Sequence, residues 1–554
     1  MTFAARMKTL LAVAVSAGLL AAQQQDQPFT LKATTRLVLL SVVAQDHDGH
    51  PDTSLHKEDF RVRVNGKAQP ISVFSMETAG ALASSVNTAS APSASTIPGA
   101  TPANTFSNRY SNGAMPSGVT VILFDTRNTR VQDQIYAKAQ IIRYLRTLQP
   151  TDHVGLYTFG ASLKVLHDYT SDSASLLQRL NSDKNWNLPD TSKEDALGAL
   201  QTEGAVFDDL SRLGGGTSPA ERSFYTTDRI LATLRTFEFV AEHLAQLPGR
   251  KNLIWVSGGF PLEIGFDTIA DWHNPAVDQR MFTDEVDRTL RAMNDAKIAV
   301  YPVDARGLMT DPRFSAANRS APKRLSMAPP VGVKEQQTMQ EVASRTGGRA
   351  FYNTNDIAHA IDAAAEDSRV TYTIGFYPND DHFDGKFHKI EVDLPNRSGV
   401  KLRYRKGYFD VPERPEDEKS RQAELRDAVW SPMDATAVGM TASVKPAPGN
   451  PSSIDVTMKV DHSSIGLRQD QSRWQGRLDV LFVQRDDQGK EYGGMDDTVQ
   501  LNLTPETYQK LVANDLGYHR VIARAPAAKV LRIVVRDASS GAMGSVTVPL
   551  NRIR

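Results

Sequence analysis

The stretch Val119–Asp125, with the sequence VTVILFD, decides the fold of this chain. Its apolar side chains run on without the alternation of a half-exposed strand and end at an acid, a pattern typical of a strand buried on both faces of a parallel sheet. The next segment has a helical period and ends at Pro150. The predicted buried face of this helix consists of Val131, Ile135, Ala139, Ile142, Leu145 and Leu148. The sequence therefore predicts a strand followed by a covering helix.

Strand and helix patterns continue to alternate after Pro150. Further strand patterns lie at residues 154–159, 253–256, 298–303, 350–352 and 370–377. The helices between them have predicted buried faces that include Ile230, Leu234, Phe237, Ala241 and Leu244, and then Val286, Leu290 and Met293. Alternating elements of this kind favour a mostly parallel sheet with helices on both faces. The fold class is therefore α/β, with a doubly wound domain over residues 118–378.

The flanking regions have strand patterns of a different kind. Period-2 alternation with an Asn65-Gly66 turn predicts a small β module over residues 28–77. A stretch rich in Ala, Ser, Thr, Pro and Gly, residues 78–117, is predicted to be a flexible linker. After the α/β domain we expect a β-hairpin extension at 379–412, a charged connector at 413–430 and a C-terminal β-sandwich at 431–554.

Composition excludes several classes of function. The 554 residues include 63 Lys+Arg and 64 Asp+Glu, so the formal net charge of −1 provides no basic excess for holding nucleic acid. No cysteine is present, which removes disulfides and thiolate chemistry. Residues 1–22 combine two cations, an apolar stretch and a small-residue end, which predicts a secretory signal peptide. We therefore expect an exported protein, in the periplasm, at the cell surface or secreted, with no transmembrane segment after signal removal.

The residues just past the predicted strands are the candidate site. Ligands of open α/β sheets bind at the carboxyl ends of the strands. Those ends are followed by DTRNT at 125–129, SGG at 257–259 and DARG at 304–307. Carboxylates and hydroxyls from separate loops are the oxygen ligands that hard cations prefer. An ion pair between Asp304 and Arg306 is the alternative interpretation of the third loop.

These motifs together resemble a known family. The strand, helix and strand pattern resembles a von Willebrand factor A domain. More narrowly, the chain resembles the von Willebrand factor A-related proteins common in Acidobacteria. The motifs that carry this resemblance are KEDF at 57–60, FDTRNT at 124–129, WVSGGFP at 255–261, YPVDARGL at 301–308 and RKGYF at 405–409.

The resemblance implies a metal-ion-dependent adhesion site, which this sequence keeps only in part. Asp125 matches the first acid and Thr129 matches the second hydroxyl, and Thr226 or Thr227 could supply the third hydroxyl. The candidate metal ligands are therefore Asp125, Thr129 and Thr227. No cofactor is assigned; if this degenerate site binds a cation, Mg²⁺ or Mn²⁺ is the expected one.

Two positions depart from the family pattern. Arg127 stands where the family has a serine, and Gly258 stands where it has an aspartate. A guanidinium beside the intended cation, and one fewer negative charge, should both weaken metal binding. One hypothesis is that Arg127 takes the cation's role by pairing with Asp125. The alternative is that Asp125 is structural and caps the following helix.

The expected function is that of an exported, non-catalytic protein-binding or adhesion protein. Its partner would be a protein or envelope component recognised at the strand ends. The residues predicted to form the rim are Arg127, Asn128, Ser257, Asp304 and Arg306. No motif pairs a nucleophile with a base, so we expect no enzyme. The alternatives are a structural cell-envelope protein that uses the A-like domain as a scaffold, and a metal-assisted hydrolase.

Overall fold

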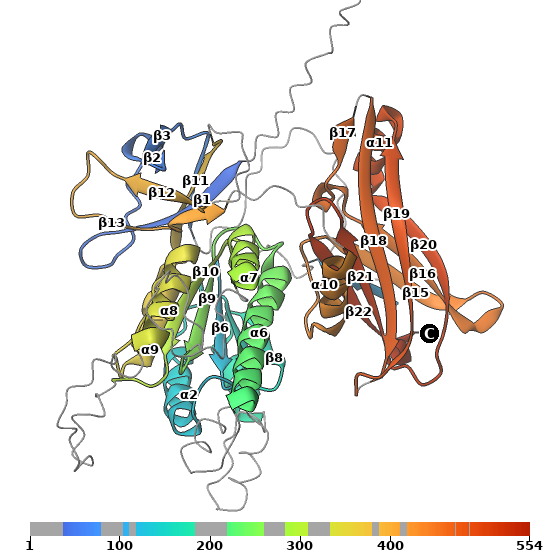
Figure 1. Cartoon of the computed structure of the whole chain (residues 1–554), viewed down its shortest axis with the longest axis horizontal. Coiled ribbons are helices and arrows are strands. Elements are labelled where there is room, and N and C mark those ends of the chain that lie inside the picture. The colour runs from blue at the N-terminus through green and yellow to red at the C-terminus, as the bar shows by residue number, and fades with distance from the viewer. Residues whose placement is uncertain are drawn as a thin grey trace, which may run out of the picture.

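The computed structural model places a central α/β domain between a β module and a C-terminal β domain (Figure 1). The residues that the structure describes are 37–78, 104–109, 118–182, 219–259, 283–308, 333–378, 387–409, 418–470, 472–486 and 488–553. The predicted signal peptide, residues 1–22, lies outside them. Within the described part of the chain, no helix is both long enough and apolar enough to cross a membrane.

The central sheet has five strands in the order β10-β9-β6-β7-β8. Its strands are β6 (Val119–Asp125), β7 (Val154–Phe159), β8 (Leu163–Thr170), β9 (Lys251–Ser257) and β10 (Ile298–Asp304). Strands β10, β9, β6 and β7 are parallel to one another, as the sequence predicts, and β8 runs antiparallel to β7. Strand β8 was not predicted, because its side chains are only partly buried and form no continuous apolar run. The strand predicted at 350–352 is reduced to one parallel bridge between Phe351 and Val303.

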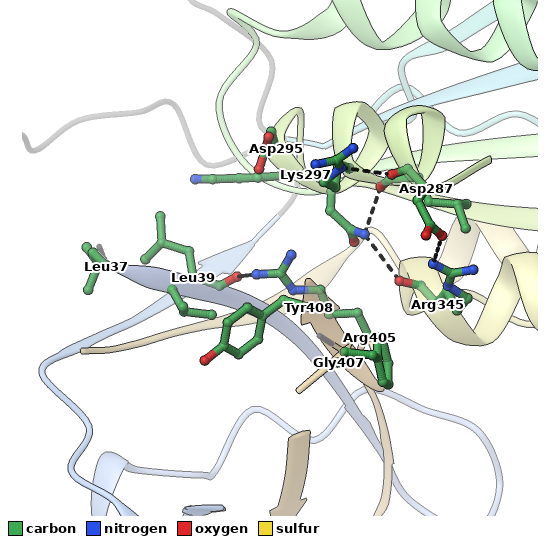
Figure 2. A pocket seen from close by; sticks show the side chains of 14 residues that line it. Leu37, Leu39, Asp287, Asp295, Lys297, Arg345, Arg405, Gly407 and Tyr408 are labelled. Carbon is green, nitrogen blue, oxygen red and sulfur yellow. Dashed lines mark hydrogen bonds and ion pairs between the residues drawn. The ribbon is translucent and has the colours of Figure 1, made fainter. Parts of the chain in front are cut away.

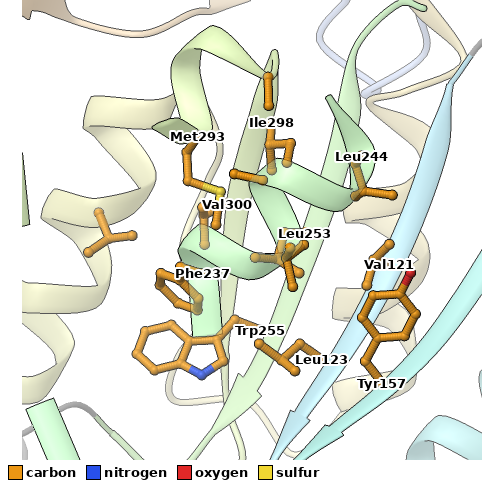
Figure 3. Close-up of a cluster of buried hydrophobic side chains, with 14 of the residues drawn as sticks. Val121, Leu123, Tyr157, Phe237, Leu244, Leu253, Trp255, Met293, Ile298 and Val300 are labelled. Carbon is orange, nitrogen blue, oxygen red and sulfur yellow. The ribbon is translucent and has the colours of Figure 1, made fainter. Parts of the chain in front are cut away.

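Helices cover both faces of this sheet. They are α2 (Val131–Leu145), α3 (Ser173–Ser182), α6 (Pro219–Leu244), α7 (Thr283–Asp295), α8 (Val333–Thr346) and α9 (Ile357–Glu366). Side chains of α6, α7 and α8 share one core with the sheet, and those of α2, α3 and α9 share another. In the first core the Phe237 ring stands edge-on to Trp255, with centroids 5.2 Å apart (Figure 3). The predicted buried faces of α6 and α7 are correct.

The predicted buried face of α2 is wrong for Val131, Ile135 and Ala139, which are exposed, whereas Leu145 is buried as predicted. The residues of α2 that are buried are Gln134, Ala137, Lys138, Ile141, Tyr144 and Leu145. Gln134 Nε2 donates to the main-chain oxygens of Thr129 (2.8 Å) and Thr126 (3.1 Å), which turns this face toward the end of β6. As a result Val131 and Ile135 are 44% and 47% exposed.

The β module is assembled from both ends of the predicted α/β domain. Its elements are β1 (Val38–Gln45), η1 (Lys57–Asp59), β2 (Arg61–Val64), β3 (Lys67–Gln69), β4 (Val73–Thr78), β11 (Val370–Phe376), β12 (Phe387–Asp393), β13 (Lys401–Arg403) and β14 (Gly407–Phe409). They form two sheets, β13-β1-β11-β4 and β14-β12-β2-β3, around one core. The N-terminal module and the hairpin extension, predicted to be separate, are therefore a single unit. Strand β11 also belongs to it, because it pairs with β1 and β4 and not with the parallel sheet.

A buried polar network fastens the β module to the amino ends of the parallel strands. The Asp367 carboxylate accepts hydrogen bonds from Gln45 Nε2 (2.8 Å), Tyr301 Oη (2.8 Å) and Arg403 Nε (3.0 Å). Arg250 Nη2 donates to the same Tyr301 oxygen at 2.9 Å. Because the module occupies the amino ends, the carboxyl-end edge of the sheet lies on the far side of the domain from it.

The C-terminal domain is a β-sandwich with two helices. Its elements are β5 (Thr105–Ser107), α10 (Glu418–Trp430), β15 (Met440–Ala447), β16 (Asn450–Val460), η4 (His462–Ser464), β17 (Arg468–Asp470), β18 (Arg473–Arg485), β19 (Glu491–Leu503), α11 (Pro505–Asn514), β20 (Leu516–Ala523), β21 (Val530–Asp537), β22 (Met543–Pro549) and η5 (Leu550–Arg552). One sheet has the order β20-β16-β15-β5 and the other β17-β18-β21-β22, with β19 on β18. Both contribute to one core. Most of the predicted charged connector is helix α10, which packs on β21.

The linker prediction is wrong for residues 104–109. Strand β5 pairs with β15 at the edge of the C-terminal sandwich. The buried Asn108 then donates to the main-chain oxygens of Ala435 (2.7 Å) and Val438 (2.8 Å) and accepts from Met440 N (2.7 Å). These hydrogen bonds hold the segment in place, although its sequence is polar and has no apolar period that would predict a strand.

Candidate functional site

Three strands of the parallel sheet end at the same level with polar side chains. Asp125 on β6 and Asp304 on β10 both lie opposite Ser257 on β9, which runs between them. All three residues are buried. The structure therefore places the predicted strand-end residues at one edge, as expected for parallel strands.

The Asp125 carboxylate is surrounded by hydrogen-bond donors. Its Oδ1 accepts from Asn128 N at 3.0 Å. Its Oδ2 accepts from Asn128 Nδ2 at 2.8 Å, and from Trp255 Nε1 and Ser257 Oγ at 3.0 Å each. Burial raises the pKa of Asp125, and the bonds from Asn128, Trp255 and Ser257 oppose this rise. This carboxylate joins β6 to β9 and closes the loop that follows β6.

A metal cation does not fit this arrangement. A hard cation needs oxygen lone pairs directed at it, but both Asp125 oxygens accept hydrogen bonds from protein groups, including an indole N–H that can only donate. Thr129 is also fully buried, and its Oγ1 donates to the main-chain oxygen of Asp125 (2.5 Å) and accepts from Gly258 N (2.8 Å). Two of the three candidate ligands are thus engaged in the protein's own bonding.

The third candidate ligand, Thr227, is half-buried on α6. Its neighbours Arg229 and Thr233 connect α6 to the loop after β6. Arg229 Nε donates to Asn128 Oδ1 at 3.0 Å, and Asn128 Nδ2 reaches Thr233 Oγ1 at 3.0 Å. Asn128 therefore connects Asp125 to α6 and is buried there, so it contributes little to an exposed rim.

Arg127 does not pair with Asp125, contrary to the hypothesis from the sequence. Its guanidinium forms an ion pair with the exposed Asp228 on α6 and donates to Gly160 O at 3.3 Å. It also lies over the Phe159 ring, 5.9 Å from the centroid. Neighbouring residues in this loop leave the strand end in different directions, so Asp125 enters the core while Arg127 stays near the surface.

Asp304 and Arg306 form the ion pair that was the alternative interpretation of their loop. Arg306 Nε and Nη2 each lie 2.8 Å from a different carboxylate oxygen of Asp304. Such a two-point contact holds the guanidinium in place. Both groups are largely buried, so this pair, like Asp125, is structural in its geometry.

Exposed apolar side chains gather at the same edge, a feature that the sequence analysis missed. We define the strand-end patch as Val131, Ile135, Tyr136, Leu308 and Tyr352, which are 37–59% exposed. Tyr136 Oη donates to the main-chain oxygen of Asn355, and Leu308 N donates to Asn355 Oδ1 at 2.8 Å, so one residue ties α2 to the loop after β10. The signal in the sequence was the helix position of Val131 and Ile135, which was assigned to the wrong face.

One hydroxyl–imidazole contact was also not predicted. His167 Nε2 lies 2.6 Å from Ser175 Oγ, and its Nδ1 lies 2.6 Å from the main-chain oxygen of Asp168. The pair joins β8 to the first turn of α3, at the sheet edge occupied by β8. The Asp168 carboxylate bonds instead to Tyr157 Oη (3.1 Å).

Comparison with known proteins gives solved structures but no family. No protein-family model matches the chain, and no curated protein matches it. An aerotolerance-related membrane protein of Bacteroides fragilis is 15% identical over 45% of this chain and 98% of its own, with a TM-score of 0.25. BatB of Bacteroides thetaiotaomicron is 16% identical over 45% and 97%, with a TM-score of 0.22.

A von Willebrand factor A protein is also among the similar structures. The ArnB paralog VWA2 of Sulfolobus acidocaldarius is 9% identical over 79% of this chain and 67% of its own, with a TM-score of 0.21. These scores are too low to say anything about what this chain binds. The structure itself has a doubly wound α/β domain. At its strand ends lie a buried polar cluster, whose groups hydrogen-bond to one another, and an exposed apolar patch.

Proposed function

We propose that this chain is an exported, non-catalytic binding protein. Its von Willebrand factor A-like domain would recognise a protein or envelope component at the carboxyl-end edge of the sheet, without a metal ion. The bonding of Asp125 carries this proposal: four donors from Asn128, Trp255 and Ser257 occupy the carboxylate that a metal-dependent site would need. Recognition at this edge then falls to the side chains at the surface.

The strand-end patch supplies the surface. Clustered exposed apolar side chains mark interaction sites on soluble proteins. Leu308, the most exposed member at 59%, follows β10, and Ile135 lies on the first turns of α2. The Arg127–Asp228 ion pair lies at the same edge of the sheet and adds charged groups to it. An apolar centre with a polar rim is the usual anatomy of a protein interface.

Export rests on the charge and apolar pattern of residues 1–22. A fusion of these residues to a reporter enzyme that is active only outside the cytoplasm tests it. Reporter activity is expected, and a fusion protein that accumulates in the cells without reporter activity would contradict export.

Binding is tested by capture from an envelope extract of the source organism with chelator present throughout. We expect a partner, identified by mass spectrometry, that the parent retains and that Ile135→Glu and Leu308→Glu variants lose. The matched control is Val512→Glu, because Val512 is 43% exposed on α11 of the C-terminal domain. Retention by both patch variants would refute the proposal and favour a scaffold role for this domain. A partner that is captured only in a parallel experiment without chelator would refute the metal-free form of the proposal.

A further inference from the structure

A pocket lies between the β module and the α/β domain, remote from the strand-end patch. It has a volume of about 150 Å³. One wall comes from α7, the turn after it and α8; the other comes from the starts of β1 and β12 and from β14 (Figure 2). Because two units of the fold build it, a molecule bound there would contact both.

The charged side chains that line the pocket are mostly basic. They are Arg291, Lys297, Arg345 and Arg405, against Asp287 and Asp295. Arg345 Nη2 bonds to Asp287 Oδ1 at 2.6 Å, so one acid is already matched with one base. The excess positive charge favours an anion in the pocket.

Two of the guanidinium groups are held in place by neutral main-chain oxygens. Arg291 Nε donates to Asp287 O at 3.1 Å, within α7. Arg405 Nη2 donates to Leu39 O at 2.9 Å, across the edge of β1 (Figure 2). Each of these bonds orients its guanidinium group. Both groups are therefore positioned in advance, which lowers the entropy lost when an anion binds.

The rest of the lining is apolar or aromatic, from Leu37, Leu39, Leu290, Phe387 and Tyr408. Gly407 allows Phe387 to pack directly against the backbone of this wall, because a Cβ at this position would lie 2.3 Å from Phe387 Cζ and 2.4 Å from His388 O. An inorganic anion would leave such a wall without contacts. An engineered apolar cavity of about 150 Å³ admits benzene, so the volume suits a compact ring or short chain.

We propose that this pocket binds a small organic carboxylate, with the carboxylate toward the arginine groups and the apolar part against Phe387 and Tyr408. A carboxylate matches a guanidinium through two parallel hydrogen bonds. By contacting α7 on one side and β1 and β14 on the other, the ligand fastens the β module to the α/β domain. Binding should therefore stabilise the junction as well as occupy the pocket.

Calorimetric titration of the whole chain with sodium benzoate tests this site, with benzamide as the uncharged analogue and inorganic phosphate as the bare anion. We expect one benzoate per chain, with benzamide about tenfold or more weaker because a charge-assisted bond is lost. Arg291→Gln should weaken benzoate by a similar factor. The matched control is Arg288→Gln, since Arg288 is on the same helix, pairs with Glu238 and does not line the pocket; its affinity should equal the parent's.

Several results would overturn the proposal. They are the absence of benzoate binding to the parent, equal affinity for benzamide, phosphate binding where benzoate does not bind, or an unchanged affinity in Arg291→Gln. Circular dichroism of each variant establishes that it is folded. If Arg291→Gln does not fold, Lys297→Gln replaces it: Lys297 lies in the turn after α7 with a positive φ of 54°, and the same weakening is expected.

Discussion

The Asp125→Ala substitution separates a structural role for this carboxylate from a metal-binding one. In the structure Asp125 accepts four hydrogen bonds from three buried residues. If the role of the carboxylate is to accept these hydrogen bonds, the variant loses stability by the same amount with and without Mg²⁺. If its role is to hold a cation, the loss of stability should depend on whether the cation is present. The two roles therefore predict different responses to Mg²⁺.

The loss in the free energy of unfolding depends on which of these donors have another acceptor. Ser257 Oγ also contacts Gly259 O at 3.1 Å, and Asn128 Nδ2 also reaches Thr233 Oγ1 at 3.0 Å, so those two donors keep a partner. Asn128 N and Trp255 Nε1 each lose their hydrogen bond to the carboxylate in the variant. A buried donor without an acceptor costs about 1–3 kcal/mol. Removal of a buried carboxylate returns part of this cost, so we expect a net loss of about 2–4 kcal/mol.

The assay must be local because the chain has several domains and does not unfold as one unit. Hydrogen exchange with mass spectrometry, in increasing urea, reports the opening of peptides from β6 and β9. The matched control is Asp228→Ala, the removal of an exposed acid at the same edge, with an expected loss of about 0–1 kcal/mol. A loss below about 1 kcal/mol in Asp125→Ala would refute the structural role. So would a Mg²⁺-dependent opening midpoint in the parent that the variant lacks.

Two further predictions concern other buried groups. Burial, together with the nearby Glu238, raises the pKa of Glu242 to about 8 from 4.5. The folded chain then keeps a proton that the unfolded chain releases, so the free energy of unfolding should fall by up to about 1.4 kcal/mol per pH unit between these values. Hydrogen exchange of α6 peptides in increasing urea, repeated across that pH range, should show a weaker dependence of stability on pH for Glu242→Gln than for the parent. An equal dependence would contradict the assignment. Asp367→Ala should remove the acceptor of Tyr301 Oη and the carboxylate that is paired with Arg403, and cost about 3–5 kcal/mol. Limited proteolysis should then release the β module earlier than in the parent, and an unchanged cleavage rate would argue against the network as its fastening.

The sequence predicts elements better than it predicts which elements meet. The apolar run of β6 and the helical face of α6 are local signals, and both match the structure. Strand β11 is also a buried apolar run, but nothing in such a run says which sheet it joins, and its partners β1 and β4 lie about 300 positions earlier in the chain. Strand β5 has no apolar period, because β15 and the bonds of Asn108 supply its order. The face of α2 was misassigned because Gln134 turns a polar side chain inward.

The same holds for the candidate site: the sequence predicts where its residues lie along the strands, but not which residues they contact. Parallel strands explain why the sequence could place Asp125, Ser257 and Asp304 at one edge. It could not show that Arg127 pairs with Asp228, 101 positions away, or that Asp125 points into the core.

Gly258, where the family pattern has an aspartate, is connected through packing to the engaged carboxylate of Asp125. At Gly258 a Cβ would lie 2.8 Å from Asn128 O, and Asn128 is the residue that donates twice to Asp125. An aspartate at that position would displace the loop that closes over Asp125. The absent ligand and the engaged carboxylate are therefore consequences of one arrangement, in which the loop after β6 packs directly against β9 and leaves recognition at this edge to the exposed side chains around it.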